Sequence, residues 1–282
     1  MDDRGLIEDA IGEPVAEMSP LHGGCLAGVF RIRTASGRDL ACKVSGADNG
    51  WARAEAQMLG RLGRVAPTPD VEAVSDRVLA MRYVAHDGRR SAGGERRLGG
   101  IVGRIHGERS GRFGWDADSL IGPVTLANGW CEDWGRFYGE TRLRPLAHRA
   151  HELGRMTRGF TDAIDRLADK LPALLESPEP PTLVHGDLWA GNVLWDRGEP
   201  AAVIDPICVW ADREAELAFI DLMGGVSGAF WEAYGRARPI RPGFWERRVH
   251  VYQIVPLLIH EILFGGGYGA RAEAALARAG GE

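Results

Sequence analysis

Apolar and polar residues follow two different patterns in the two parts of this chain. In the first 84 residues the apolar positions form short runs, a pattern typical of β-strands. A helix with Ala54, Met58 and Leu62 along one side separates two antiparallel strand pairs. The predicted elements are a short helix at Leu6–Ile11, strands at Val29–Thr34, Asp39–Val44, Val71–Val74 and Val78–Val84, and a helix at Trp51–Leu62.

Beyond residue 84 the apolar residues recur at steps of three and four, which indicates helices. The predicted helices are Leu98–Gly107, Leu146–Leu171, Ala215–Met223, Phe244–Phe264 and Gly269–Ala279. A strand, a loop and a second pair of strands interrupt them between residues 183 and 204. We therefore predict an α+β fold, with a β-rich N-terminal lobe over residues 1–84 and a mainly helical C-terminal lobe over residues 85–282.

Composition and charge exclude several classes of protein. Of the 282 residues, 45% are hydrophobic and 26% are charged, and the net charge of −5 argues against a general nucleic-acid binder. The acidic start Met1-Asp2-Asp3 leads into no signal peptide, and the apolar run Val251–Phe264 is too short to span a bilayer. The cysteines form no CxxC pair, which fits a reducing compartment, so we expect a cytoplasmic protein. From the charge and the apolar runs we expect neither nucleic-acid nor membrane partners.

The segment Thr182–Pro206, TLVHGDLWAGNVLWDRGEPAAVIDP, concentrates polar residues that could carry chemistry. Two short apolar runs after Asn192 predict a hairpin, and since the ends of a hairpin meet, Asn192 and Asp205 should lie side by side. An amide oxygen and a carboxylate are donors suited to Mg²⁺. Asp187 precedes them on the same loop, where it can accept a proton or orient a hydroxyl, whereas His185 is interpreted as a loop organiser.

This arrangement meets the needs of phosphoryl transfer, which requires an orienting carboxylate, Mg²⁺ and a cation on the nucleotide phosphates. Asp187 and Asn192 fit the D-x-x-x-x-N spacing of protein kinases, and Asp205 stands where their D-F-G motif begins. Gly186 replaces the Arg that senses activation-loop phosphate in protein kinases, and no A-P-E motif follows. We therefore predict a small-molecule kinase with a two-lobed, protein kinase-like fold.

Lysine usage indicates the cation that would anchor the phosphates. Only two of the 34 basic residues are lysines, Lys43 and Lys170. Lys43 lies in the strand before the Trp51–Leu62 helix, and Glu55 in that helix is its predicted ion-pair partner. Lys170 ends a long amphipathic helix and is expected at the surface.

Two further segments are expected to contact the nucleotide. The loop Leu21–Gly28 contains Gly23 and Gly24 and is placed to cover phosphates, although it is neither G-x-G-x-x-G nor a Walker loop. The segment Met81–Val84, including Tyr83, closes the small lobe where an adenine would meet backbone N–H and C=O groups. The predicted cofactors are ATP and Mg²⁺.

Together these features resemble the fructosamine kinases, or ketosamine-3-kinases, which share a protein kinase-like fold with aminoglycoside phosphotransferases and choline kinases. The matching segments are GGC at 23–25, HGDLWAGNVLWD at 185–196, DPICVWADREAELA at 205–218 and FGGGY at 264–268. An insert at about 113–145, FGWDADSLIGPVTLANGWCEDWGRFYGETRLRP, resembles the family's segment over the substrate cleft. The matches are spread over nearly the whole chain.

The resemblance implies roles for individual residues. Asp187 would be the base toward the 3-hydroxyl of an amino-ketose carried by a small molecule or a protein, and Trp189 would offer a flat apolar face to the sugar. It also implies substrate contacts at Trp134 and Asp212. Cys25 implies a redox-sensitive homodimer as an alternative to a monomer, unless it is an inert loop thiol.

Some residues depart from the family pattern, and two other functions stay open. Leu126 stands where the family has Gln, Glu216 where Asp is usual, and Arg82 where an acidic residue is common. An aminoglycoside or other small-alcohol phosphotransferase would have an acidic cleft, whereas this insert is aromatic and basic, with Trp130, Trp134, Arg136 and Arg142. A nucleotide-binding pseudokinase scaffold would not need the complete catalytic set. The sequence leaves open which ketosamine sugar is used.

Overall fold

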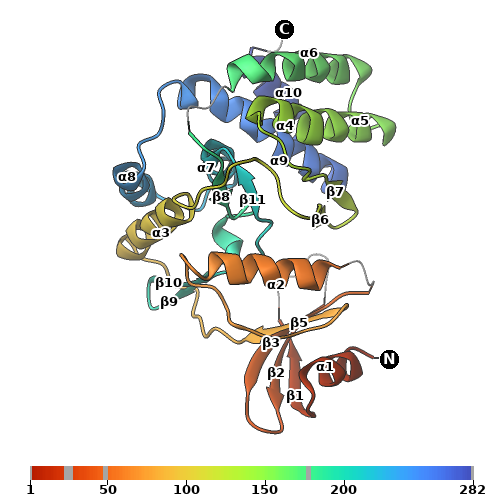
Figure 1. The fold of residues 1–282 in the computed structure, drawn as a ribbon, viewed down its shortest axis with the longest axis vertical. Coiled ribbons are helices and arrows are strands. Elements are labelled where there is room, and N and C mark those ends of the chain that lie inside the picture. Colours follow the sequence, from red (N-terminus) through yellow and green to blue (C-terminus); the bar gives the residue numbers. More distant parts are fainter. Residues whose placement is uncertain (1, 22–27, 47–49, 176–178, 281–282) are drawn as a thin grey trace. The chain divides into compact units, whose positions relative to one another are not determined.

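The computed structural model describes the whole chain except residues 1, 22–27, 47–49, 176–178 and 281–282. Its packing divides the chain into two compact units, each assembled from segments distant in sequence. The first unit contains residues 1–104, 190–207 and 227–234, and the second contains residues 105–189, 208–226 and 235–282 (Figure 1). The predicted lobes 1–84 and 85–282 are continuous stretches of sequence, whereas these two units are not, and the lobe boundary stays a prediction.

An antiparallel five-stranded sheet forms the centre of the first unit, in the order β1-β2-β3-β5-β4. The strands are β1 (Val15–Pro20), β2 (Gly28–Thr34), β3 (Asp39–Val44), β4 (Val71–Val74) and β5 (Val78–Arg82). The four predicted strands are confirmed to within two residues at each end. β1 does not show the apolar pattern, because this edge strand buries Val15 but exposes Glu17 and Ser19.

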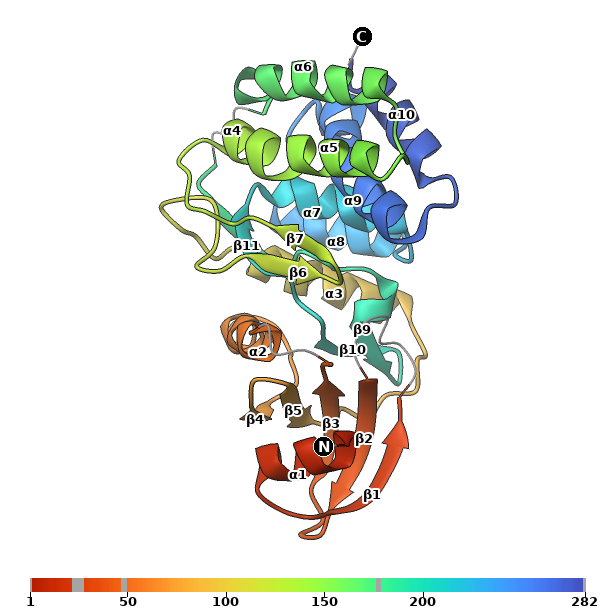
Figure 2. The same cartoon turned by 90° about the vertical axis from the view of Figure 1, so that its right-hand side faces the viewer.

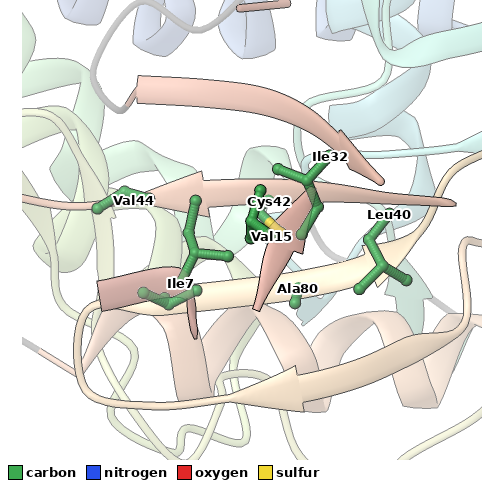
Figure 3. Close-up of a cluster of buried hydrophobic side chains, with 8 residues drawn as sticks. Ile7, Val15, Ile32, Leu40, Cys42, Val44 and Ala80 are labelled. Carbon is green, nitrogen blue, oxygen red and sulfur yellow. The ribbon is translucent and has the colours of Figure 1, made fainter. Parts of the chain in front are cut away.

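The sheet has two covered faces, and β3 shows how its residues divide between them. Leu40 and Cys42 point to the face covered by α1 (Asp3–Ile11), where they join the hydrophobic cluster of Figure 3. The opposite face packs through β5 on α2 (Trp51–Leu62). Because side chains alternate along a strand, Lys43 lies on the α2 face of the sheet.

A late segment of the chain completes the first unit. β9 (Val193–Asp196) and β10 (Glu199–Val203) form the predicted hairpin after a 3-10 turn at Ala190–Asn192. The Val203 N–H donates to the carbonyl of Pro67 at 2.9 Å. A backbone hydrogen bond therefore fastens the end of the hairpin to the N-terminal segment.

The helix α3 (Ala92–Ile105) approaches its neighbours in this unit closely. A Cβ atom on Gly94 would lie 2.0 Å from the carbonyl oxygen of Gly198, and one on Gly99 would lie 2.5 Å from that of Phe230 in α8 (Gly228–Ala237). Only glycine fits at these two positions. The helix predicted at 98–107 starts too late, because glycine in the first turns of α3 weakens the helical pattern.

Helices make up most of the second unit. They are α4 (Trp134–Tyr138), α5 (Arg144–Glu152), α6 (Arg158–Leu174), α7 (Arg213–Met223), α9 (Val249–Phe264) and α10 (Tyr268–Arg278), with π-helical turns at Gly139–Leu143 and Phe244–Arg248. The largely buried α9 packs on α5, α7 and α10 (Figure 2). In the part of the chain that the structure describes, no helix has both the length and the apolar character needed to cross a bilayer.

The predicted single helix over Leu146–Leu171 is wrong, because the chain forms two helices there. α5 ends at Glu152, and Gly154 then adopts the left-handed region with φ of 70°. α6 starts after Thr157, whose hydroxyl oxygen accepts a hydrogen bond from the Phe160 N–H. Both helices bury apolar residues, so the hydrophobic spacing continues across the break and hides it.

Short strands link the start of the insert at 113–145 to β8, the strand before His185-Gly186-Asp187, which we call the HGD loop. They are β6 (Ser119–Ile121), β7 (Val124–Leu126), β8 (Thr182–Val184) and β11 (Val209–Ala211), with β6 paired to β7 and β8 to β11. Trp210 of β11 exchanges two backbone hydrogen bonds with Gly114, and Phe113 exchanges two with Cys131. The start of the insert therefore belongs to a backbone ladder that includes β8, the strand leading into the HGD loop.

Candidate active site

Lys43 of β3 lies at the centre of a buried ion-pair cluster in the first unit. Its ammonium lies 2.5 Å from the carboxylate of Glu55 in α2 and 2.6 Å from that of Asp205, which follows β10. The side chains of Lys43 and Glu55 are only 11% and 16% exposed. The predicted ion pair is therefore present, and Asp205 joins it directly.

The Lys43 cluster contains two carboxylates and one ammonium, and so carries one excess negative charge. Burial by itself would lower the pKa of Lys43, but the charges of Glu55 and Asp205 raise it above 10.5. For Glu55, burial and the charge of Asp205 raise the pKa against the opposing effect of Lys43. Excess negative charge favours bound protons, and it would equally favour a bound cation.

Asp205 and Asn192 lie at the open end of the β9–β10 hairpin. The Ile204 N–H donates to the Asn192 carbonyl oxygen at 3.0 Å, so the residues flanking the hairpin are neighbours. Asp205 has φ of 59°, a left-handed conformation that costs an L-residue about 1–2 kcal/mol and that Asp and Asn adopt most readily after Gly. Such conformations cluster at functional sites.

The donor set at this hairpin end fits Mg²⁺. Asn192 can supply an amide oxygen and Asp205 a carboxylate, both hard donors, next to a cluster with excess negative charge. Across the described ranges, no three His, Cys, Asp or Glu side chains gather into a metal cage. Mg²⁺ commonly uses one or two carboxylates and completes its shell with water and phosphate oxygens, so a cage is not required.

The segment predicted to meet the adenine lies at the end of β5. Met81 is buried within the strand, and the ring of Tyr83 lies 3.9 Å from the guanidinium of Arg31. The carbonyl of Val84 is hydrogen-bonded to Nδ1 of His86 at 2.9 Å. Adenine contacts here stay a prediction. The predicted residues that lie outside the described part of the chain are Gly23, Gly24 and Cys25.

The HGD loop follows β8 in the second unit. His185 is fully buried, and its Nδ1 accepts a hydrogen bond from the Asp187 N–H at 3.3 Å. Gly186 between them has φ of 86°, a value that favours glycine. Asp187 is half-buried and Trp189 is 39% exposed. The contact at His185 fits the loop-organising role, and the catalytic roles of Asp187 and Trp189 stay predictions.

A buried carboxylate also contacts this loop. Glu216 of α7 accepts the Gly186 N–H at 2.6 Å through Oε1 and the His106 Nε2–H at 2.8 Å through Oε2. In the sequence, Glu216 stands out only as a departure from the family pattern, and His106 is not among the predicted site residues. A signal was present, since His106 continues the apolar spacing from Leu98 to Ile105, and a polar residue at such a position needs a buried partner.

Two predicted substrate residues are packed inside the second unit. Trp134 is 4% exposed, and its indole N–H donates to the Tyr252 hydroxyl at 2.9 Å. The cavity it borders measures about 110 Å³, which is small for a ligand site. Asp212 accepts hydrogen bonds from the Glu214 N–H and from Arg241, at 2.9 and 2.5 Å. Substrate contacts at Trp134 and Asp212 stay predictions, and this packing does not favour them.

Arg142 holds two segments of the insert together through hydrogen bonds from its guanidinium. Its side chain is buried, and it donates to the carbonyl of Ala127 at 2.5 Å and to the side-chain oxygen of Asn128. Burial lowers the pKa of Arg142 to about 10. The positive charge expected on the substrate face of the insert is therefore turned inward at this position.

The comparisons with known proteins agree with these features. The fructosamine kinase family model matches residues 3–279. The chain belongs to the fructosamine kinase family. A "Probable ketoamine kinase" of Lactiplantibacillus plantarum is 33% identical over 267 residues, which cover 90% of this chain and 91% of the relative. The crystal structure of a "putative fructosamine-3-kinase" of Thermobifida fusca has a TM-score of 0.89 at 32% identity, covering 99% of this chain and 98% of that one.

Structures outside the fructosamine kinase family share the fold alone. An ADP-bound aminoglycoside phosphotransferase has a TM-score of 0.65 at 14% identity, covering 99% of this chain and 98% of that one. The predicted α+β, protein kinase-like fold is thereby confirmed.

Proposed function

We propose that this chain is an ATP-dependent kinase that phosphorylates the 3-hydroxyl of an amino-ketose, on a free amine or on a protein. Membership of the fructosamine kinase family supports this class of reaction. The observation that carries the proposal is the Lys43 ammonium held between the carboxylates of Glu55 and Asp205. A buried cation next to a magnesium-type donor pair is what phosphoryl transfer requires of a protein.

In this proposal Lys43 stabilises the negative charge of the ATP phosphates, and Glu55 holds its ammonium in place. Because the pKa of Lys43 is raised, the side chain stays charged at neutral pH. Asn192 and Asp205 would hold Mg²⁺, which neutralises charge on the phosphate oxygens when bound. Positioning and charge stabilisation provide most of the rate enhancement in such reactions.

The acceptor side of the reaction is assigned to the HGD loop. Asp187 accepts the proton of the 3-hydroxyl as the hydroxyl oxygen forms its bond to the γ-phosphorus and the bond to ADP breaks. The exposed ring of Trp189 offers an apolar face for the carbon skeleton of the sugar. A phosphate at C3 sits on the carbon next to the C2 carbonyl. Loss of a C1 proton would give the 1,2-enaminol, which can expel the phosphate from C3 and leave an imine at C1. Hydrolysis of that imine by water would release the free amine and repair a glycated molecule.

An ATP-consumption screen over amino-ketoses, choline and aminoglycosides tests the proposed function. We expect ADP formation with fructosamine-type or ribulosamine-type acceptors, and a phosphate ester at C3 by NMR. Asp187→Asn should lower kcat by about 10²–10⁴-fold, the range for a positioned base. Turnover with aminoglycosides or choline but with no amino-ketose would show that the proposed substrate class is wrong. ATP binding without turnover on any acceptor would favour the pseudokinase scaffold.

A further inference from the structure

Arg31 of β2 and Asp39 of β3 form a two-armed ion pair across neighbouring strands. Arg31 donates from Nε to Oδ1 of Asp39 at 2.9 Å and from Nη2 to Oδ2 at 2.6 Å. These hydrogen bonds lower the pKa of Asp39 below 3.8, so its carboxylate stays charged at neutral pH. The planar guanidinium is therefore held in one orientation, although 43% of the Arg31 side chain is exposed.

The strand register places this ion pair on the face of the sheet that carries Lys43. Val29 is paired with Lys43 and Arg31 with Ala41, so these side chains share a face with Asp39. Asp39 precedes Lys43 by four residues on β3, which is about 13 Å along a strand. Val29 and Ala41 between them are half-buried, because α2 covers the β5 side of this face. The ion pair thus ends an apolar strip that starts at the proposed phosphate-binding lysine.

Both members of the ion pair also hold Tyr83, in the segment predicted to meet the adenine. The backbone N–H of Tyr83 donates to the carbonyl oxygen of Asp39 at 3.0 Å. The guanidinium of Arg31 lies over the Tyr83 ring, 3.9 Å from its centroid. A backbone hydrogen bond, an ion pair and a cation–π contact therefore join these three residues in a closed triangle, which we call the Arg31 clamp.

Holding Tyr83 also holds the peptide that joins it to Val84. β5 ends at Arg82, so this peptide lies just beyond the regular ladder. In the part of the chain that the structure describes, the Val84 N–H has no hydrogen-bond partner within the protein. A backbone N–H of this kind takes its partner from water or from a ligand. The Arg31 clamp therefore determines the position of one backbone donor that is available to a ligand.

We propose that Arg31 is a positioning residue that determines base specificity: by clamping Tyr83, it presents the Val84 N–H to N1 of an adenine. The proposal deepens the proposed function and rests on it for ATP as the nucleotide. Adenine N1 is a hydrogen-bond acceptor, whereas guanine carries a proton on N1. A fixed N–H that faces another N–H leaves both donors unpaired, so the clamp favours ATP over GTP. Arg31 does this without touching the base.

The matched test compares two Arg–Asp ion pairs of the first unit. Arg53 of α2 donates to Asp76 at 2.7 Å on the exposed surface. Arg31→Gln should raise the Kd of MgATP by about three- to tenfold, the size of a lost cation–π contact and ion pair. The kcat of this variant at saturating ATP should stay within twofold of wild type. Arg53→Gln should keep the wild-type Kd. A wild-type Kd in Arg31→Gln would overturn the inference.

The choice of base separates positioning from a general effect on the fold. A loosened Val84 N–H should weaken ATP binding more than GTP binding, so the ratio of the Kd for GTP to that for ATP should fall in Arg31→Gln. Arg31→Lys keeps a positive charge near the Tyr83 ring but loses the two-armed contact, and should lie between wild type and Arg31→Gln. Equal losses for both nucleotides, with a lowered Tm of the free protein, would show that Arg31 only stabilises the sheet.

Calorimetric titration with MgATP and MgGTP needs no acceptor, so it separates this inference from the proposed function. If the wild type binds ATP with the expected dependence on Arg31 but phosphorylates no amino-ketose, the proposed function fails and the inference stands. If the wild type phosphorylates amino-ketoses and Arg31→Gln keeps the wild-type ratio of the two Kd values, the inference fails and the kinase assignment stands.

Discussion

The ammonium of Lys43 lies 2.6 Å from the carboxylate of Asp205, although 162 residues separate the two in the sequence. One belongs to the central strand of the sheet, and the other follows a hairpin that is hydrogen-bonded to the N-terminal segment. Burying charge is costly unless the partners are well placed, so this contact is weak evidence for stability. Buried charge clusters with shifted pKa values are better read as candidates for function.

Replacing Lys43 by Met should lower kcat/KM by about 10²–10³-fold, as when other preorganised charge-stabilising groups are removed. The change leaves the carboxylates of Glu55 and Asp205 facing each other without a cation. Steady-state kinetics with varied ATP measures the loss. Lys170→Met removes the chain's other lysine from the exposed face of α6 and should keep wild-type activity. Equal activity of the two variants would show that Lys43 has no part in the mechanism.

Substitutions at Asp205 should separate metal binding from backbone conformation. Asp205→Asn and Asp205→Ala both lose the carboxylate, so both should raise the Mg²⁺ concentration needed for half-maximal activity. Only Ala adds strain, because it tolerates positive φ poorly, and urea unfolding should show it less stable than Asn by about 1 kcal/mol. An unchanged Mg²⁺ requirement in both variants would count against the metal role.

Arg142→Lys should destabilise the insert. A single ammonium cannot reproduce the two-armed contact with Ala127 and Asn128, and an unsatisfied buried acceptor costs about 1–3 kcal/mol. We therefore expect a loss of about 2 kcal/mol in the free energy of unfolding, measured by denaturant titration. Arg136→Lys on the exposed side of α4 is the control and should change stability little. Equal stability of both variants would contradict the fixing role of Arg142.

Acid should remove part of the stability that Glu214 provides. This buried carboxylate accepts from Arg248 at 2.6 Å and Arg241 at 3.0 Å, and although burial raises its pKa, these bonds bring it below 4.5. A carboxylate with a lowered folded pKa stabilises the fold above its unfolded pKa and loses this effect as pH falls through the folded value. The Tm gap between wild type and Glu214→Gln should therefore narrow below about pH 4.5. A Tm difference between the two proteins that stays constant from pH 7 to pH 3 would show that the Glu214 carboxylate does not stabilise the fold in this way.

The members of the Lys43 cluster could be predicted because each of them stands out in the sequence pattern of its own helix, strand or hairpin. Lys43 interrupts an apolar strand, Glu55 lies inside a helix with clear spacing, and a hairpin brings Asp205 back to Asn192. These patterns are determined by neighbours in the chain. The spacing of the kinase motif then joined them into one chemical hypothesis.

Other features depend on partners that the sequence pattern does not specify. The contact between His106 and Glu216 joins residues 110 positions apart, and no local periodicity relates them. Trp134 and Asp212 sit in motifs that resemble substrate segments, yet their polar groups are bound inside the fold by Tyr252 and Arg241. Burial of a polar side chain is a property of the assembled unit, so motif matching cannot reveal it.

The discontinuous first unit has a consequence for biosynthesis. A nascent chain that has emerged only as far as residue 104 holds all five strands of the sheet, but it lacks residues 190–207 and with them Asp205. Lys43 and Glu55 can meet at that stage as a balanced pair of charges. The excess negative charge that would attract a divalent cation arises only after the ribosome has added the distant hairpin, so the charge cluster proposed to bind metal and nucleotide is completed late in the growing polypeptide.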